Sequence, residues 1–233
     1  MIPPRRLHPL VPLESLEPPA DQGDPARPLW YAAYGSNMHL DRLAYYLEGG
    51  RPPGALRTYP GCRDPRPPVR SSPVLLPGRL YFAAESPVWT GGSAFFDPDA
   101  DGELPALAHL VTAAQFSDIA AQEVHREPGR DLDLTQLLRH GRERLGPGRY
   151  ETLVYAGLLD GCPVVTFTAP GGLADAAVNA PSPAYLRHLV AGLVSAHGWS
   201  PLEAATYLAS CPGAAGQWPP AAIAALLTED PSG

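Results

Sequence analysis

The order in which strand-like and helix-like segments follow one another most restricts how this chain can fold. Short apolar runs at Leu29–Tyr34, Leu80–Ala83, Ser93–Phe96 and Leu107–Val111 have the length and composition of buried strands. The helical segments do not alternate with these runs in the regular βαβ order that builds a parallel sheet. The order therefore predicts an α+β fold, either a small mixed β-barrel or a strongly curved sheet, with flanking helices.

Capping and turn signals predict the other elements. Thr112 and Gln115 form a capping-box signature that opens a helix running to about Val124. Ser182 precedes Pro183, a residue favoured at the first helical position, and predicts a second helix. A hairpin is predicted for Tyr150–Leu158 and Val164–Thr168 around the turn Asp160-Gly161. The helix that begins after Ser182 is predicted to end at Gly198, and a capping box at Ser200–Glu203 predicts the start of another helix. Further helices are predicted at Met38–Leu47, near Leu132–Arg139 and at Ala221–Leu227.

Proline density suggests where the folded part begins. Residues 1–28 carry eight prolines and little apolar periodicity, so we expect an extended, disordered leader there. Residues 29–228 are predicted to form a single domain, because neither a repeat nor a long linker divides them. Residues 229–233 are predicted to be a tail. Within the domain, the Pro- and Arg-rich residues 51–73 are predicted to be irregular.

The charged residues exclude several classes of site. All 17 basic residues are Arg, and the sequence contains no Lys. A Schiff-base lysine, a pyridoxal-phosphate lysine and a P-loop lysine are therefore excluded. The formal net charge is −7 and the arginines are scattered. Because phosphate binding needs clustered cations, we expect no nucleic-acid partner.

The cysteines and the N-terminus indicate the compartment. Cys62, Cys162 and Cys211 are widely spaced and include no C-x-x-C pair, which fits a reducing compartment. No apolar segment of the signal-peptide kind follows the charged residues at the N-terminus. No window approaches the roughly 18 uncharged apolar residues of a membrane span. We expect a cytoplasmic protein with no membrane association.

One acidic segment resembles a metal site. The run Asp97–Glu103 has the pattern of the first half of a calcium-binding EF-hand loop. Its twelfth position is Ala108, where such a loop needs a bidentate Glu, and no predicted helices flank it. The run therefore fits an acidic hairpin turn. The seven histidines include no pair at metal-ligand spacing on one face, so we expect no metal site.

The loop after the first predicted strand is a candidate binding site. There the run Leu29–Tyr34 meets Gly35 and then a predicted helix. Such a junction leaves backbone N–H groups free, and glycine permits both a close ligand approach and a positive φ. With the positive end of the helix dipole, the junction would favour a small anion such as a carboxylate. The same residues also fit an ordinary strand-to-helix turn capped by Ser36 or Asn37.

Glu123 is a candidate acid/base group. It lies at the end of the helix that Thr112 opens, where the amphipathic pattern turns toward the interior. The helix dipole disfavours a carboxylate at that end, and burial would further raise its pKa. Such tuning suits proton transfer near neutral pH. Taken singly, the residue also fits a solvated surface glutamate.

Four features of the sequence resemble those of the γ-glutamylcyclotransferase family and follow one another in the same order as in that family. They are the run Tyr31-Ala32-Ala33-Tyr34-Gly35-Ser36-Asn37, similar to the family's Y-x-x-Y-G-S-N; the strands at 93–96 and 107–111 with an acidic turn between them; Gln122-Glu123, at the place of the family's catalytic glutamate; and Pro181-Ser182-Pro183-Ala184-Tyr185, similar to its P-S-P-x-Y. The resemblance spans about Leu29 to Leu208.

The resemblance implies an activity and a site. Family members cyclise a γ-glutamyl amide: the substrate's α-amine attacks its own γ-carbonyl group, which gives 5-oxoproline and a free amine or amino acid. Glu123 would move the proton, and the residues Tyr31–Asn37 together with Tyr185 would line the substrate site. The partner would be a small γ-glutamyl molecule, and no metal, nucleotide or other cofactor would be needed.

Other interpretations stay open. The segment Val124–Arg149 carries arginines at 126, 130, 139, 142, 144 and 149 and is longer than the resemblance leads us to expect. It could reshape the side of the site that holds the leaving group, so the enzyme could instead remove a γ-glutamyl protecting group from a biosynthetic intermediate. A catalytically silent binding or interaction module on the same fold is a third interpretation. The sequence indicates neither the pathway nor the oligomeric state.

Overall fold

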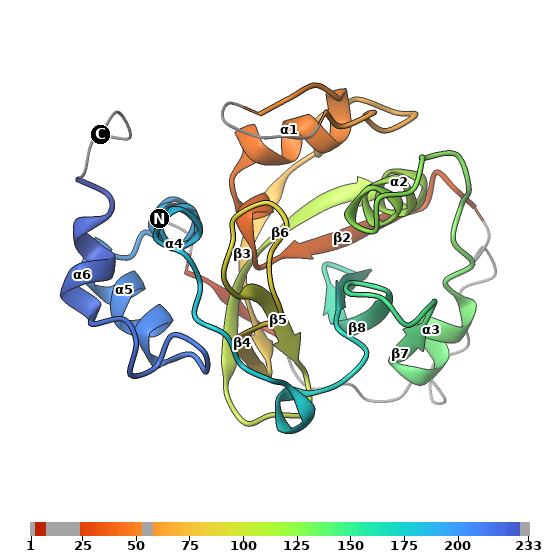
Figure 1. Ribbon diagram of the computed structural model, residues 1–233. Coiled ribbons are helices and arrows are strands. Elements are labelled where there is room, and N and C mark those ends of the chain that lie inside the picture. The colour runs from red at the N-terminus through yellow and green to blue at the C-terminus, as the bar shows by residue number, and fades with distance from the viewer. Residues whose placement is uncertain (1–2, 8–23, 53–57, 229–233) are drawn as a thin grey trace.

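The computed structural model describes residues 3–7, 24–52 and 58–228 (Figure 1). Its strands form a seven-stranded sheet and a separate pair. In spatial order the large sheet contains β1 (Arg5–Arg6), β3 (Ser71–Pro77), β6 (Glu103–Thr112), β2 (Pro28–Ala33), β9 (Cys162–Thr168), β8 (Thr152–Leu159) and β7 (Arg142–Arg144), and the pair contains β4 (Arg79–Ala83) and β5 (Ser93–Asp97).

The large sheet is mixed and has two free edges among the described residues. Strands β1 and β3 are parallel, as are β2 and β9, and the other neighbours are antiparallel. Because β1 and β7 form the two edges, these strands do not close into a barrel. The predicted α+β class is confirmed. Of the two predicted architectures, the curved sheet is right and the barrel is wrong.

Helices surround the sheet (Figure 1). Helices α4, α5 and α6 gather on one side of the molecule, away from α2 and α3. The helices are α1 (Leu40–Glu48), α2 (Ala113–Glu123), α3 (Thr135–His140), α4 (Pro183–His197), α5 (Pro201–Ser210) and α6 (Pro220–Ala225), with 3-10 turns η2 (Ser36–Met38) and η3 (Leu173–Asp175). None of the helices in the described residues has the length and apolar character needed to cross a membrane.

The capping signals are confirmed in atomic detail. The side chain of Thr112 accepts from the backbone N–H of Gln115, and the side chain of Gln115 accepts from the backbone N–H of Thr112. The side chain of Ser182 caps α4 by accepting from the backbone N–H of Tyr185, with Pro183 at the first helical position. The contacts of Thr112 and Gln115 fix where α2 begins.

Two local predictions need correction. Strand β3 begins at Ser71, inside the segment predicted to be irregular. Its Pro73 and Pro77 have no N–H to donate, and they are tolerated on this side of the strand because β1 pairs only with Val74 and Leu75. The acidic run after β5 is no hairpin turn, since β5 pairs with β4 while β6 pairs with β2 and β3. It connects the two sheets.

Part of the predicted leader packs on the sheet. Arg5 and Arg6 pair with β3, and the backbone N–H of Leu7 donates to the carbonyl oxygen of Leu75 at 3.0 Å. The Leu7 side chain is 8% exposed and belongs to the main hydrophobic core. Residues 5–7 therefore differ from the disordered leader that proline density predicted. Residues 8–23 and the predicted tail 229–233 lie outside the described residues.

A buried histidine joins the sheet to the loop that follows β2. His109 lies in β6, is fully buried and stands opposite both Tyr31 and Ser71. Its Nε2 is 3.1 Å from the backbone carbonyl oxygen of Asn37, and its Nδ1 is 2.8 Å from Ser71 Oγ. Because a carbonyl only accepts, Nε2 carries the proton and Nδ1 accepts from the serine. Burial lowers the pKa of His109 to about 4, which keeps the ring neutral.

We expect Leu7→Ala to lower the free energy of unfolding by about 2 kcal/mol, because it removes buried apolar atoms from the edge of the core. Val69→Ala is the matched control, since Val69 is 83% exposed and should change stability by less than about 0.5 kcal/mol. Urea denaturation measures both. Equal stabilities for the two variants would mean that residues 5–7 do not pack on the folded protein.

A second expected outcome concerns pH and His109. Its folded pKa of about 4 is below the ordinary 6.5, so the unfolded chain binds the proton first as pH falls. The histidine's contribution is complete above about pH 6.5 and is lost toward pH 4, on the order of 3 kcal/mol in total. His109→Gln should be less stable at pH 7, but its stability should fall less steeply over this window. Parallel curves of unfolding free energy against pH would contradict this.

Candidate active site

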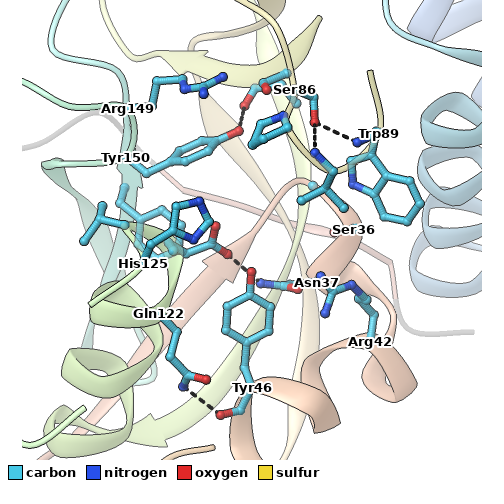
Figure 2. Close-up of a pocket in the computed structure, with 18 of the residues that line it drawn as sticks. Ser36, Asn37, Arg42, Tyr46, Ser86, Trp89, Gln122, His125, Arg149 and Tyr150 are labelled. Atoms are coloured by element: carbon cyan, nitrogen blue, oxygen red, sulfur yellow. Dashed lines mark hydrogen bonds between the residues drawn. The ribbon is translucent and has the colours of Figure 1, made fainter. Parts of the chain in front are cut away.

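A cavity of about 330 Å³ opens where β2 ends (Figure 2). Its walls come from the loop after β2, from α1, from the C-terminal end of α2 and from two segments at 86–89 and 148–151. These parts are far apart in the sequence. Residues that line the cavity include Tyr31, Gly35, Asn37, Arg42, Tyr46, Trp89, Glu123, Arg149, Tyr150 and Tyr185.

Most residues predicted for the site reach this cavity. Those that line it are Tyr31, Tyr34, Gly35, Ser36, Asn37, Glu123 and Tyr185. Ala32 and Ala33 do not, which corrects their inclusion in the predicted site. They are buried within β2, where they stand opposite Ala108 and Leu107 of β6. Neighbouring residues of a strand point to opposite faces, so Ala32 cannot share the cavity face with Tyr31.

Gly35 is required for space rather than for a special backbone angle. Its φ is −107°, so the positive φ that a glycine would permit is not used. A Cβ at this position would lie 3.3 Å from the hydroxyl oxygen of Tyr185, which is tight contact. Tyr185, in the first turn of α4, therefore reaches the loop across the missing side chain. Neither Ser36 nor Asn37 caps a helix here, contrary to the alternative of an ordinary capped turn.

Asn37 holds the carboxylate of Glu123. Its Nδ2 donates to Glu123 Oε1 at 3.1 Å and lies 3.3 Å from Tyr31 Oη. Asn37 is 4% exposed, while Glu123 is half-buried at the cavity wall. The neighbouring Gln122 fixes the end of α2, since its Nε2 donates to the backbone carbonyl oxygen of Tyr46 at 2.9 Å. The carboxylate is thus positioned from both α1 and the loop.

Tyrosines surround this carboxylate. Burial raises the pKa of Tyr31 and of Tyr46, and the negative charge of Glu123 raises each further. Burial likewise raises the pKa of Tyr150 and Tyr185, with a smaller contribution from Glu123. All four hydroxyl groups therefore stay protonated near neutral pH.

Two residues that line the cavity, Arg42 and Tyr46, were not predicted as site residues, although their spacing in the sequence was informative. They are four residues apart in the predicted helix and therefore share one face. The Arg42 guanidinium lies over the rings of Tyr46 and Tyr59, 5.2 and 4.7 Å from their centroids. A cation and an aromatic residue at this spacing, directly after the glycine loop, could have identified this wall.

Trp89 also lines the cavity, but no sequence pattern marks it as a site residue. It lies in the segment that joins β4 to β5, and its ring stacks on Tyr185 with centroids 5.8 Å apart and planes at 11°. The hydroxyl of Ser86 accepts from the backbone N–H groups of Val88 and Trp89 at 3.3 and 3.0 Å (Figure 2). Only the tertiary structure brings this loop over the cavity.

The Arg-rich segment after Glu123 contributes part of the wall. Val124, His125 and Arg126 line the cavity at one end of the segment and Arg149 at the other. Arg126 forms an ion pair with Glu151 at 2.5 Å. The hydroxyl of Tyr150, the residue after Arg149, donates to the backbone carbonyl oxygen of Ala94 at 2.9 Å. Figure 2 labels both Arg149 and Tyr150.

No group of three or more His, Cys, Asp or Glu side chains in the described part of the chain is placed to hold a metal ion. The three cysteines are unpaired thiols. Burial raises the pKa of Cys62 and of Cys211 to about 12, so neither is a thiolate near neutral pH. Groups at the cavity that can transfer a proton or donate a hydrogen bond include Glu123, its surrounding tyrosines, His125 and the arginines.

One curated protein is similar to the chain in sequence. It is named histone deacetylase 5, from Arabidopsis thaliana, and is 30% identical over 198 residues. The match covers 77% of this chain but 30% of that protein, so the chain spans less than a third of its relative's length. No family model matches the chain.

Two solved structures are also similar. A protein named gamma-glutamyl cyclotransferase aligns with a TM-score of 0.48 and 14% identity, over 80% of this chain and 89% of that one. An uncharacterized protein from Homo sapiens aligns with a TM-score of 0.47 and 16% identity, over 79% of this chain and 89% of that one. Similarity at this level assigns no activity. The first of the two carries the name of the family that the sequence motifs resemble.

Proposed function

We propose that this protein is a γ-glutamyl cyclotransferase in which Glu123 is the acid/base group. The observation that supports this most strongly is the hydrogen bond from Asn37 to Glu123, which holds a carboxylate at the wall of a cavity large enough for a small molecule. Gly35 and Tyr185 line the same cavity. The motif resemblance singles out these same four residues.

The proposed reaction needs a base and a cavity that folds the substrate. The substrate's α-amine forms a bond to its γ-carbonyl carbon, the bond from that carbon to the leaving nitrogen breaks, and 5-oxoproline is released. Glu123 accepts a proton from the attacking amine and delivers one to the leaving nitrogen. Because nucleophile and electrophile belong to one molecule, positioning them in the cavity supplies much of the rate.

The cavity also offers donors for the charge that develops. As the amine attacks, negative charge appears on the γ-carbonyl oxygen, and preorganised donors stabilise it most in a site that excludes water. We assign this role to the Tyr185 hydroxyl and to backbone N–H groups of residues 35–37. The raised pKa of Tyr185, caused first by burial, keeps that hydroxyl protonated.

The identity of the leaving group remains part of the proposal. Arg126 and Arg149, which line the cavity, lie on the segment that departs from the family resemblance. Two outcomes are in view: release of a free amine or amino acid, or removal of a γ-glutamyl protecting group from a biosynthetic intermediate. Incubation with a panel of γ-glutamyl amides, with 5-oxoproline as the readout, separates them. Binding of an amide without any turnover would instead indicate a silent binding module.

Glu123→Gln is expected to reduce turnover by about 10²–10⁴-fold, the usual contribution of general acid/base catalysis. This equals about 3–5 kcal/mol in the activation barrier. KM should change little, because the glutamine fills the same volume and its amide oxygen can still accept from Asn37. Steady-state kinetics on a γ-glutamyl amide measures both constants.

Glu127→Gln is the matched control for that experiment. Glu127 is exposed, lies four residues further along the chain and does not line the cavity. Its activity should equal that of the unmodified protein. Full turnover by Glu123→Gln would refute the assignment of the base, whatever the substrate.

Gly35→Val is expected to raise KM and lower kcat, because the new side chain must displace either the Tyr185 hydroxyl or the loop. A displacement of this size lowers kcat/KM by roughly 10–100-fold. Gly171→Val is the control, since a Cβ at Gly171 would meet only Asp175, at 3.8 Å. Unchanged kinetics for Gly35→Val would show that the loop and Tyr185 do not enclose the substrate.

A further inference from the structure

Arg42 is a buried cation whose hydrogen bonding is incomplete. It is 8% exposed and lines the cavity. Its Nη2 donates to Tyr59 Oη at 2.5 Å, while its Nη1 has no hydrogen-bond partner among the described residues. A buried charged group with an unused donor is costly unless another group satisfies it. The incomplete set of contacts therefore suggests an acceptor that the described part of the chain does not supply.

The arginine keeps its charge despite burial. Burial alone would lower the pKa of Arg42, but the neighbouring Tyr46 and Tyr59, and then the charge of Glu123, raise it above its ordinary value. The rings of these two tyrosines also lie against the guanidinium, which restricts its orientation. A fixed planar guanidinium is well suited to bind a carboxylate through paired hydrogen bonds.

A second unused polar atom lies close by. The Asn37 side-chain amide donates to Tyr31 and to Glu123, whereas its Oδ1 has no hydrogen-bond partner among the described residues. Asn37 and Arg42 line the same cavity and are both labelled in Figure 2. The wall next to Glu123 thus carries an unused acceptor and an unused donor together. A ligand with an ammonium group and a carboxylate on the same carbon atom could satisfy both, since its ammonium would donate to the Asn37 oxygen and its carboxylate would accept from Arg42.

We infer that Arg42 binds the α-carboxylate of the substrate and so selects ligands with an α-amino-acid head group. The inference rests on the proposed function in taking that head group to belong to a γ-glutamyl molecule. The α-amine and the α-carboxylate share one carbon, so the group that removes the amine's proton and the cation that binds the carboxylate must lie near each other. Glu123 and Arg42 meet this requirement, because both line the cavity and the charge of Glu123 contributes to the raised pKa of Arg42.

The test compares two ligands that differ only in the α-carboxylate, namely L-glutamate and 4-aminobutanoate. Neither carries an amide leaving group, so binding is measured without turnover. By calorimetry, the unmodified protein should bind L-glutamate about 10–100-fold more tightly, as expected for hydrogen bonds to a charged group. Arg42→Met should lose this preference while its affinity for 4-aminobutanoate stays within about threefold.

Two further variants make the comparison decisive. Arg42→Lys keeps the charge but not the planar donors and should retain part of the preference, which supplies a result if Arg42→Met does not fold. Arg70→Met is the control: Arg70 packs over Trp30 and bonds Asp160, does not line the cavity, and should preserve the full preference.

The outcomes separate this inference from the proposed reaction. Equal affinity of the unmodified protein for the two ligands, no binding of either, or an equal loss for both in Arg42→Met overturns the role of Arg42. An equal loss would show that the arginine serves only to maintain the pocket and Glu123. If the preference and its loss are observed but no γ-glutamyl amide yields 5-oxoproline, the head-group site stands and the proposed reaction fails.

Discussion

The hydrogen bond between Asn37 and Glu123 is the contact on which the rest of the cavity depends. It joins the loop after β2 to the last residue of α2, two segments 86 residues apart. A carboxylate at the C-terminal end of a helix is disfavoured by the helix dipole, so Glu123 needs donors from outside its own helix. The Asn37 amide supplies one, and it is free to do so because this side chain caps neither η2 nor α1.

Asn37 is itself held from the sheet. Its backbone carbonyl accepts from His109, which in turn accepts from Ser71 on β3. Three strands therefore fix the loop: β2 leads into it, β6 carries the histidine and β3 carries the serine. Because the histidine is buried and neutral, this connection adds no charge near Glu123. A rigid central sheet thus positions a group that lies on a helix.

The cavity places charged groups where water is limited. Glu123 and Arg42 both line it, and buried tyrosine rings lie between and around them. Electrostatic interactions strengthen when solvent is excluded, so each charge affects its neighbours more than it would at the surface. This is why burial and the charge of Glu123 together raise the tyrosine pKa values. The same conditions favour binding of a small molecule that carries both an ammonium and a carboxylate.

The sequence by itself determined the elements whose signals are local. The capping box of Thr112, the cap at Ser182 and the turn at Asp160-Gly161 depend on side chains that bond within a few residues, so their positions could be predicted. The motif resemblance also identified Gly35 and Tyr185, which line the cavity.

Only the tertiary structure decided which residues meet. Whether the sheet closed, that Leu7 would pack on its edge, and that Ala32 and Ala33 would face the core depended on strand pairing between distant segments. Arg42, Trp89 and Tyr150 reach the cavity from three different segments, and no local pattern specifies such convergence. Local sequence sets hydrogen bonds within a turn or a helix, whereas a cavity forms from long-range packing, which no single segment encodes.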